Sequence, residues 1–206
     1  MSLRRVICGG LLLFPVALAA AGDRARNLQM SDVHGGIIKP FATGTQASVA
    51  FFVATDCPVS NGYAPEIQRI CREYTARGVG CSLIYEDVDA VPHNPKLAQQ
   101  VRAHLDDFKY SGIPAALDED RGAANLAKAS ITPTAVVMNR DGELRYRGRI
   151  DNLYAALGKT RQQVTSHDLR DALDAVLAAR PVPHPETEAI GCFITDPAVL
   201  RTHSHE

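Results

Sequence analysis

Residues 55–61 read Thr-Asp-Cys-Pro-Val-Ser-Asn and stand between the apolar run 47–54 and a helix-like stretch. This order predicts that Cys57 lies where a strand meets a helix. The unpaired N–H groups of a helix's first turn stabilise an anion, so a cysteine there can ionise more readily and act as a nucleophile. Pro58 suits the first helical position, where its missing N–H costs no hydrogen bond. The Asp56 carboxylate opposes ionisation, so we expect a moderately activated thiol with an accessible sulfur.

Patterns on both sides of this motif predict alternating strands and helices. The runs 48–54 and 79–85 are almost continuously apolar, which is typical of strands buried on both faces. The other expected β-elements are an N-terminal ribbon at 27–38 with a Gly35-Gly36 turn, a strand at 113–117 and a hairpin of 135–139 with 144–150. Helices are expected from Cys57 to Arg77, at 95–108, at 123–129 and at 166–179. The last of these should be capped by Thr165 or Ser166, with Asp168 in its first turn. This order favours a mixed sheet covered by helices on both faces.

The first residues have the pattern of a secretion signal. Arg4-Arg5 precede an apolar run at 6–21, and small residues permit cleavage after Ala19 or Ala21. The alternative is an uncleaved membrane anchor, but the run is interrupted by glycines and proline and is short of the roughly 20 apolar residues of a span. We therefore expect a periplasmic or secreted protein with no stable membrane insertion after signal cleavage.

Composition excludes some classes of partner. Loss of residues 1–21 removes two arginines and no acid, which leaves 20 Lys+Arg against 23 Asp+Glu and a formal charge of −3. No basic stripe for nucleic acid remains. The remaining length of about 185 residues suits one compact α/β domain.

Four further motifs follow in a specific order: Tyr63-Ala64-Pro65-Glu66-Ile67, Ile131-Thr132-Pro133-Thr134, Arg147-Gly148-Arg149-Ile150-Asp151 and Gly191-Cys192-Phe193-Ile194. With the 55–61 motif they resemble the redoxin (AhpC/TSA-like) branch of the thioredoxin-like superfamily, and more specifically a group of exported bacterial redoxin proteins. The resemblance covers roughly residues 27–194. It implies a thioredoxin-like fold and a chemistry of thiols and disulfides.

The same resemblance implies a substrate-binding role for Pro58, Thr132 and Pro133. Thioredoxin-like proteins keep a cis-proline beside the active sulfur, and Pro133 stands at the matching place. If that peptide bond is cis, the backbone of Thr132 should face Cys57 and pair with an extended substrate. An ordinary trans-proline at the start of a strand is the alternative.

Four of the five cysteines remain after signal cleavage: Cys57, Cys71, Cys81 and Cys192. An even number in an oxidising compartment permits three complete pairings. A shared helix would separate Cys57 from Cys71 by roughly 21 Å, well beyond the ~7 Å limit for a disulfide. Cys71 and Cys81 flank a tight connection, so they are candidates for a structural disulfide, with two reduced core thiols as the alternative.

Cys192 follows the proline-rich stretch 181–185, which cannot be helical and predicts a semi-extended, mobile arm. In one interpretation Cys57 attacks a disulfide or is oxidised, and Cys192 resolves the intermediate. In the other, the arm only packs its apolar end on the sheet. Ser60 stands where a two-cysteine motif has its second thiol; its hydroxyl either donates to a Cys57 thiolate or only caps the helix.

A peroxidase is the main alternative function. Peroxiredoxins resemble this region, but they carry a threonine and a proline where this chain has Ala54 and Ala50. Thr55 is only two residues before Cys57, so its side chain should point to the opposite side of the strand from the position that the peroxiredoxin threonine occupies. Arg147 or Arg149 could still place a cation near the Cys57 sulfur; the alternative is that both arginines are solvated.

Two weaker alternatives concern metals and partners. Copper-delivery relatives of the fold use two cysteines four residues apart, whereas Asn61 follows Cys57 at that spacing, and the 203–206 tail (His-Ser-His-Glu) is more simply a solvated end. We expect no metal and no organic cofactor. A non-catalytic thioredoxin-fold interaction module is the second function class, and the missing second motif cysteine favours it.

Together these patterns predict an α/β thioredoxin-like fold with a central mixed β-sheet flanked by helices, an N-terminal β-ribbon and a C-terminal tail. The expected organisation is a signal peptide at 1–21, a redoxin domain at 22–180 and an arm and tail at 181–206. The expected function is an exported thiol–disulfide oxidoreductase with Cys57 as nucleophile. Its partners are protein or small-molecule thiols and disulfides.

Overall fold

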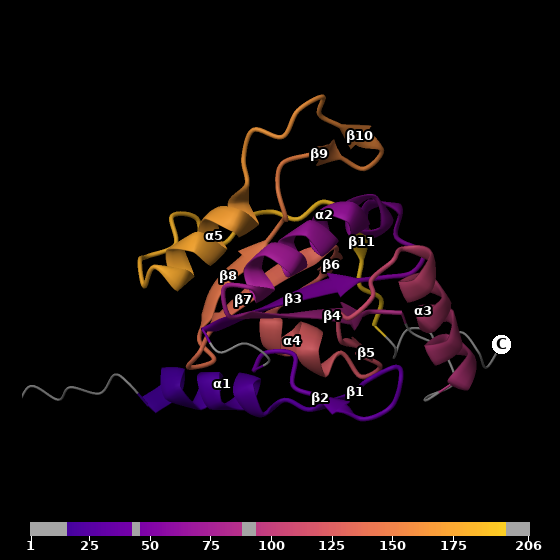
Figure 1. Ribbon diagram of the computed structural model, residues 1–206, viewed down its shortest axis with the longest axis horizontal. Helices are drawn as coiled ribbons and strands as arrows, with labels where there is room; N and C mark the ends of the chain where they lie inside the picture. The colour runs from indigo at the N-terminus through magenta and orange to yellow at the C-terminus, as the bar shows by residue number, and fades with distance from the viewer. Residues whose placement is uncertain (1–15, 43–45, 88–93, 197–206) are drawn as a thin grey trace, which may run out of the picture.

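The central sheet has five strands in the order β5-β4-β3-β7-β8 (Figure 1). The computed structural model describes residues 16–42, 46–87 and 94–196. The five strands are β3 (Ala47–Val53), β4 (Val79–Tyr85), β5 (Ala115–Leu117), β7 (Thr134–Asn139) and β8 (Leu144–Gly148). β4 is parallel to β3 and to β5, whereas β7 is antiparallel to both β3 and β8. The predicted mixed sheet is therefore confirmed.

The sheet separates two apolar cores because successive side chains of a strand point to opposite faces. On β3, Val49 and Phe51 enter one core, while Ala50 and Phe52 enter the other. Every residue of β3 and of β4 is buried. Burial on both faces is the reason why the two runs are almost continuously apolar in the sequence.

Helices cover both faces, as predicted (Figure 1). Buried side chains of α2 (Pro58–Thr75), α3 (Pro95–Asp107) and α5 (Asp168–Leu177) belong to the first core. Those of α1 (Val16–Asn27) and α4 (Gly122–Ala127) belong to the second. The bounds of α3 and α5 lie within the predicted helical segments, and α4 begins one residue before its predicted segment.

The predicted cap of α5 is wrong. The helix has His167 at its N-cap position, and that residue makes no side-chain capping bond. The Ser166 hydroxyl donates instead to the Asp168 carboxylate at 2.8 Å. A hydrogen bond to a carboxylate is stronger than one to a neutral backbone group, which explains why the hydroxyl is taken. Asp168 does lie in the first turn of the helix, as predicted.

The N-terminal segment packs under the sheet. β1 (Met30–Ser31) and β2 (Ile37–Ile38) form the predicted antiparallel ribbon, with Gly35 and Gly36 at the turn. α1 runs through both expected cleavage points and places Ala25 in the second core. Signal cleavage stays a prediction, and Cys8 and the 203–206 tail lie outside the described residues.

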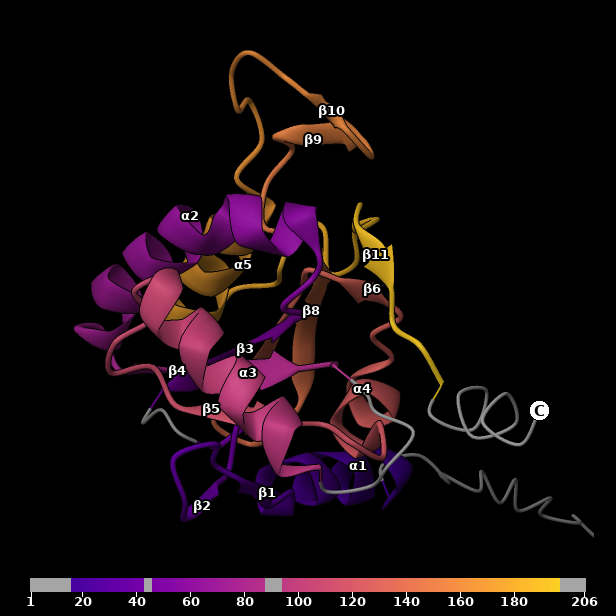
Figure 2. The ribbon, with the colours of Figure 1, turned by 90° about the vertical axis from the view of Figure 1, so that its right-hand side faces the viewer.

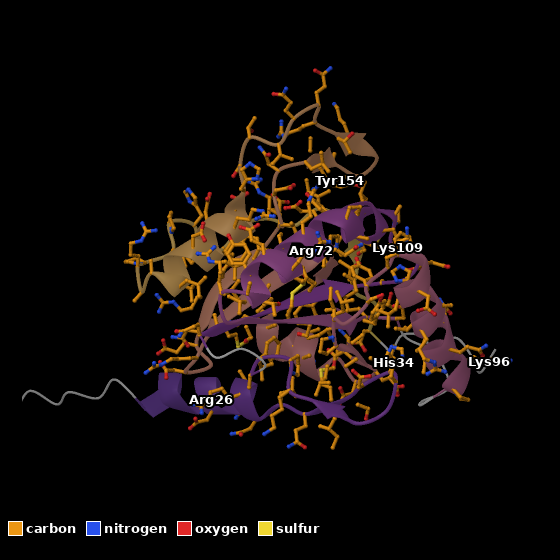
Figure 3. The ribbon with its side chains drawn as sticks, viewed as in Figure 1. Arg26, His34, Arg72, Lys96, Lys109 and Tyr154 are labelled. Carbon is orange, nitrogen blue, oxygen red and sulfur yellow. A yellow bond between two sulfur atoms is a disulfide. The ribbon has the colours of Figure 1, made fainter. Side chains whose placement is uncertain are left out.

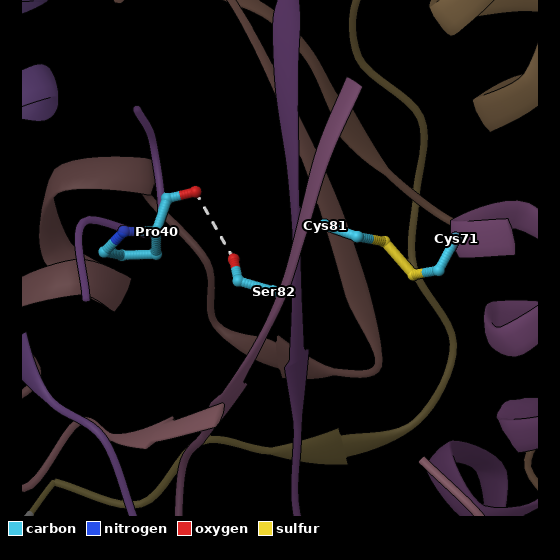
Figure 4. Close-up of a disulfide and its surroundings, with 4 residues drawn as sticks. All are labelled: Pro40, Cys71, Cys81 and Ser82. Atoms are coloured by element: carbon cyan, nitrogen blue, oxygen red, sulfur yellow. Dashed lines mark hydrogen bonds between the residues drawn. A yellow bond between two sulfur atoms is a disulfide. The ribbon is translucent and has the colours of Figure 1, made fainter. Parts of the chain in front are cut away.

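A disulfide joins α2 to the sheet (Figure 4). Cys71 lies near the end of the helix and Cys81 on β4, with Cα atoms 5.6 Å apart. Ser82 points to the opposite face of β4, where its hydroxyl donates to the Pro40 carbonyl at 3.3 Å. The bond therefore fastens the helix that carries Cys57 at its N-terminus to the centre of the fold.

Two features after β8 were not predicted. β9 (Tyr154–Ala156) and β10 (Lys159–Thr160) form a small hairpin above α2 (Figures 1 and 2). β11 (Cys192–Phe193) pairs antiparallel with β6 (Ile131–Thr132), beside the N-terminal end of α2 (Figure 2). Both ladders are only two or three residues long, so neither leaves a periodic signal in the sequence.

The proline-rich arm is non-helical, as predicted, and it lies along β8. The Arg147 N–H donates to the Pro185 carbonyl, and the Thr187 N–H donates to the Arg147 carbonyl, each at 3.0 Å. Gly148 permits this approach because a Cβ there would lie 2.1 Å from Thr187 Oγ1. These bonds define the path of the arm, and its mobility stays a prediction. None of the helices in the described segments is long and apolar enough to cross a bilayer.

Candidate functional site

Cys57 is the N-cap residue of α2, at the junction that the sequence predicts. Its backbone is still extended, with φ −84° and ψ 108°, while its carbonyl already accepts the Asn61 N–H at 3.0 Å. The Cys57 sulfur accepts a hydrogen bond from the Ser60 N–H at 3.5 Å. The thiol therefore lies where the first turn of the helix offers unpaired donors.

The prediction of an accessible sulfur is wrong, because Cys57 is 0% exposed. The Thr132 carbonyl oxygen lies 3.1 Å from its sulfur and accepts the S–H of the neutral thiol. Cys192 also lies near the Cys57 sulfur, because it stands opposite Thr132 in the ladder of β11 with β6, and its thiol lowers the Cys57 pKa. Both covering groups come from segments distant in the chain, so the local motif gives no sign of them.

The pKa values of Cys57 and Cys192 are shifted in opposite directions. Burial raises the pKa of Cys57, but the side chains of Cys192, Ser60 and Thr132 and the Ser60 N–H act as donors and outweigh it, so the net pKa is lowered. Burial raises the pKa of Cys192 to about 12, with contributions from the hydrogen bond to Cys57 and from the charges of Cys57 and Asp56. Cys57 is therefore the thiol that ionises, and Cys192 keeps its proton and donates it.

Two polar neighbours of Cys57, Asp56 and Ser60, affect the ionisation of the two thiols. The Asp56 carboxylate, expected to oppose ionisation of Cys57, contributes to the raised pKa of Cys192. The Ser60 side chain is 1% exposed, and its hydroxyl makes no hydrogen bond of standard geometry among the described residues. That hydroxyl is available to the Cys57 sulfur, whose pKa it lowers. Ser60 therefore fits the role of a thiolate donor better than that of a cap.

The Thr132–Pro133 peptide bond is cis. As expected, the Thr132 backbone faces Cys57, but its edge is occupied: in the ladder, Cys192 stands opposite Thr132 and Phe193 opposite Ile131. Thr132 and Pro133 are buried, whereas Pro58 is exposed at the start of α2. The chain's own C-terminal segment thus lies where an extended substrate was expected.

A hydrogen-bonded network beneath the motif was not predicted. The Asn61 side-chain amide donates to the Thr55 carbonyl at 3.0 Å, and its oxygen lies 2.8 Å from His104 Nε2. The other ring nitrogen of His104 lies 2.9 Å from the Tyr85 hydroxyl. Burial lowers the His104 pKa, so a neutral ring that donates from Nε2 and accepts at Nδ1 satisfies both contacts. The network holds the turn that precedes Cys57.

Tyr154 is a second residue that the sequence analysis missed. It lies between the hairpin and α2 (Figure 3), and its ring packs 5.1 Å from that of Tyr63. Burial raises the pKa of Tyr154, and the Cys57 charge adds to the shift, so its hydroxyl belongs to the surroundings of the sulfur. A Cβ on Gly62 would lie 2.0 Å from that hydroxyl. A glycine inside a helix was the available signal for this close approach.

Polar groups that a peroxidase would need are engaged elsewhere. The Thr55 hydroxyl bonds to Asp87 and accepts from Gln100 at 2.7 Å. Arg149 forms an ion pair with Asp168 at 2.8 Å, and Arg147 pairs with Glu186. The largest contributions to the Cys57 pKa come from burial, Cys192, Ser60 and Thr132, and not from an arginine. Within the part of the chain that is described, no three His, Cys, Asp or Glu side chains gather as a metal site.

Comparisons with known proteins agree with the fold. The sequence profile of the AhpC/TSA family matches residues 21–147, more than half of the chain. No curated protein matches this chain. The solved structure of an uncharacterized conserved protein from Geobacillus kaustophilus is 26% identical, with a TM-score of 0.70 over 82% of this chain and 87% of that one.

Two other solved structures are similar. A hypothetical protein from Sinorhizobium meliloti 1021 is 26% identical, with a TM-score of 0.69 over 83% of this chain and 91% of that one. A thioredoxin-like protein from Aeropyrum pernix is 14% identical, with a TM-score of 0.53 over 76% of this chain and 91% of that one, a likeness of fold alone. The family match and these likenesses confirm the expected family and fold: the chain belongs to the AhpC/TSA family and has a thioredoxin-like fold.

Proposed function

We propose that the protein is an exported thiol–disulfide oxidoreductase in which Cys57 and Cys192 form the redox pair. The observation that carries the proposal is the pairing of Cys192 with Thr132, whose carbonyl oxygen lies 3.1 Å from the Cys57 sulfur. It brings a cysteine of raised pKa beside a cysteine of lowered pKa. The thiolate is the nucleophile in disulfide exchange, and a protonated neighbour can supply the proton that a departing thiolate needs. The substrates are protein or small-molecule disulfides.

The exchange proceeds in two balanced steps. The Cys57 thiolate attacks one sulfur of a substrate disulfide, forms a mixed disulfide and releases the other sulfur as a thiolate. Cys192, after losing its proton to that departing thiolate, attacks the Cys57 sulfur and releases the second substrate thiolate. Two electrons pass from the protein to the substrate. The protein gains one Cys57–Cys192 disulfide, and the reverse sequence oxidises a substrate dithiol.

Three features prepare Cys57 for the first step. The Ser60 N–H and hydroxyl stabilise the thiolate. The Asn61–His104 hydrogen bond fixes the turn, and the disulfide of Cys71 with Cys81 fixes the other end of α2. The position of the sulfur is therefore set before a substrate arrives.

Export is part of the proposal, and two observations support it. Residues 1–21 have the charge and hydropathy pattern of a signal peptide. A disulfide such as Cys71–Cys81 persists in oxidising compartments and is rare where thiols are kept reduced. A periplasmic or secreted protein satisfies both.

The test is single-turnover exchange with a peptide disulfide that carries a fluorophore and a quencher. The mature protein should separate the two halves, and Cys57→Ser should not. Cys192→Ser should stop at a mixed disulfide whose mass is that of the protein plus one half of the peptide, because nothing resolves it. Full turnover by Cys57→Ser, or no mixed disulfide in Cys192→Ser, would refute the assignment.

A further inference from the structure

We propose that the edge of β6 beside Cys57 binds extended peptides in which glycine directly precedes cysteine, and that residues 191–194 occupy this edge as an internal copy of such a substrate. The inference rests on the proposed function and names its substrate class. The copy reads Gly-Cys-Phe-Ile.

The backbone of the arm occupies the edge of β6 as a bound strand would. Cys192 and Phe193 pair antiparallel with Thr132 and Ile131, and the Ile194 N–H donates to the Ser130 carbonyl at 3.0 Å. The edge of a short strand offers unpaired N–H and C=O groups to any extended chain that reaches it. Addition of a strand to such an edge is a general way of binding peptides.

The sulfur of Cys192 takes the place that a substrate sulfur needs. Exchange requires the two sulfurs to meet, and Cys57 is fully buried beneath its neighbours. Cys192 stands opposite Thr132, whose carbonyl oxygen lies 3.1 Å from the Cys57 sulfur, and its own side chain is only partly buried. A substrate cysteine can therefore reach Cys57 only by displacing Cys192 and taking the same register on β6.

Gly191 shows how the edge selects the residue before the cysteine. A Cβ at this position would lie 1.8 Å from the Thr132 carbonyl oxygen and 2.7 Å from its carbonyl carbon. Both are backbone atoms, and the same carbonyl is in contact with the Cys57 sulfur. Any residue larger than glycine would push the strand away from the edge, so a peptide in this register needs glycine there.

The two residues after Cys192 differ in how far their side chains are buried. Phe193 is 84% exposed, so its side chain is not recognised by the edge. Ile194 is 8% exposed and belongs to the second core. The edge therefore favours the pattern glycine, cysteine, any residue, aliphatic residue. It also follows that the arm competes with external peptides for the edge.

The experiment measures how tightly the full mature chain binds a fluorescent peptide. The peptide has the sequence of residues 189–195 with Cys192→Ser. The serine prevents exchange, so only strand binding is observed. The chain variant Gly191→Ala should release the arm and bind the peptide at least tenfold more tightly than the unaltered chain. Gly122→Ala is the matched control, since Gly122 opens α4 without a positive φ and a Cβ there meets only the Asp120 side chain, at 3.0 Å, and it should bind like the unaltered chain.

The peptide supplies the second comparison. Against the Gly191→Ala chain, a peptide that itself carries Gly191→Ala should bind at least tenfold more weakly than the glycine peptide. Equal binding of the two peptides, or no gain by the Gly191→Ala chain, overturns the inference. If that variant does not fold, hydrogen exchange of the unaltered chain decides. Saturating peptide should speed exchange of the Ile194 amide, and an unchanged rate overturns the inference.

Failure here is distinguishable from failure of the proposed function. A chain that performs exchange with a disulfide but binds neither peptide retains its function and loses this substrate class. A chain that binds the glycine peptide but forms no mixed disulfide at Cys57 has a peptide-binding edge without the proposed chemistry.

Discussion

Cys192 lies beside Cys57, because it stands opposite Thr132 on β6 and the Thr132 carbonyl oxygen is 3.1 Å from the Cys57 sulfur; this contact joins the last described strand of the chain to the first turn of α2. The ladder between β11 and β6 holds it in place. The contact explains why Cys57 is buried and still has a lowered pKa. Loss of the contact should therefore change the ionisation of Cys57.

The first prediction concerns ionisation of Cys57. Cys192→Ala removes a hydrogen bond that lowers the Cys57 pKa, so that pKa should rise. The variant leaves Cys57 as the sole free thiol of the mature chain, and the ultraviolet absorbance of its thiolate can be followed against pH. Cys192→Ser keeps a hydroxyl donor and should give a smaller rise. An unchanged or lower pKa in Cys192→Ala would contradict the described contact.

The second prediction concerns Glu86, which lines a cavity of about 380 Å³ beside Thr132 and Cys192. Burial, followed by the charge of Asp118, raises the Glu86 pKa to about 9. The folded protein then keeps a proton that the unfolded chain loses above its ordinary pKa of 4.5. Stability should therefore fall as pH rises between about 4.5 and 9.

Glu86→Gln removes this titration with little change of shape. The free energy of unfolding of the variant, relative to the unaltered chain, should increase with pH on the order of 1 kcal/mol per unit. Urea denaturation of both chains at pH 5, 7 and 8.5 measures the difference. A difference that does not grow with pH would show that Glu86 is ionised in the folded protein.

The third prediction concerns the disulfide of Cys71 with Cys81, which closes a loop of sequence separation 10. Loop-closure entropy predicts that the double variant Cys71→Ala/Cys81→Ala loses about 2.5 kcal/mol of unfolding free energy. Denaturant unfolding measures the loss, with Cys192→Ala as a control that removes a free thiol and no disulfide. A double variant as stable as this control would mean that the bond does not contribute to stability.

The fourth prediction concerns peroxide. Ala54 and Ala50 stand where peroxiredoxins carry threonine and proline, and Thr55 is bonded to Asp87. Cys57 should therefore react with hydrogen peroxide no faster than an ordinary thiolate, which stopped-flow mixing can measure. Rapid, saturable peroxide consumption that disappears in Cys57→Ser would favour a peroxidase instead.

The sequence predicted the parts of the fold that local patterns specify. β3 and β4 are apolar throughout because both of their faces are buried, and α2 follows a recognisable N-terminal motif. The ribbon with its Gly35-Gly36 turn and the hairpin through Asp141-Gly142 follow from turn chemistry. The positions of Cys57, Ser60 and the cis-proline Pro133 also follow from short motifs.

The remaining features depend on tertiary contacts. Exposure of Cys57 was predicted wrongly because Thr132 and Cys192 cover it from distant segments. The path of the arm along β8 was not predicted, because its bonds depend on a register that the prolines do not reveal. His104 and Tyr154 carried no recognisable motif, and only Gly62 hinted at a close approach.

A disulfide map of the oxidised mature protein shows whether Cys57 and Cys192 form the redox pair. The protein is oxidised with a small-molecule disulfide, freed of excess reagent, digested without reduction and analysed by mass spectrometry. The account predicts a peptide that links Cys57 to Cys192, together with the Cys71–Cys81 bond. Absence of the Cys57–Cys192 peptide, with unchanged exchange turnover in Cys192→Ser, would contradict the account and leave Cys57 as a lone thiol.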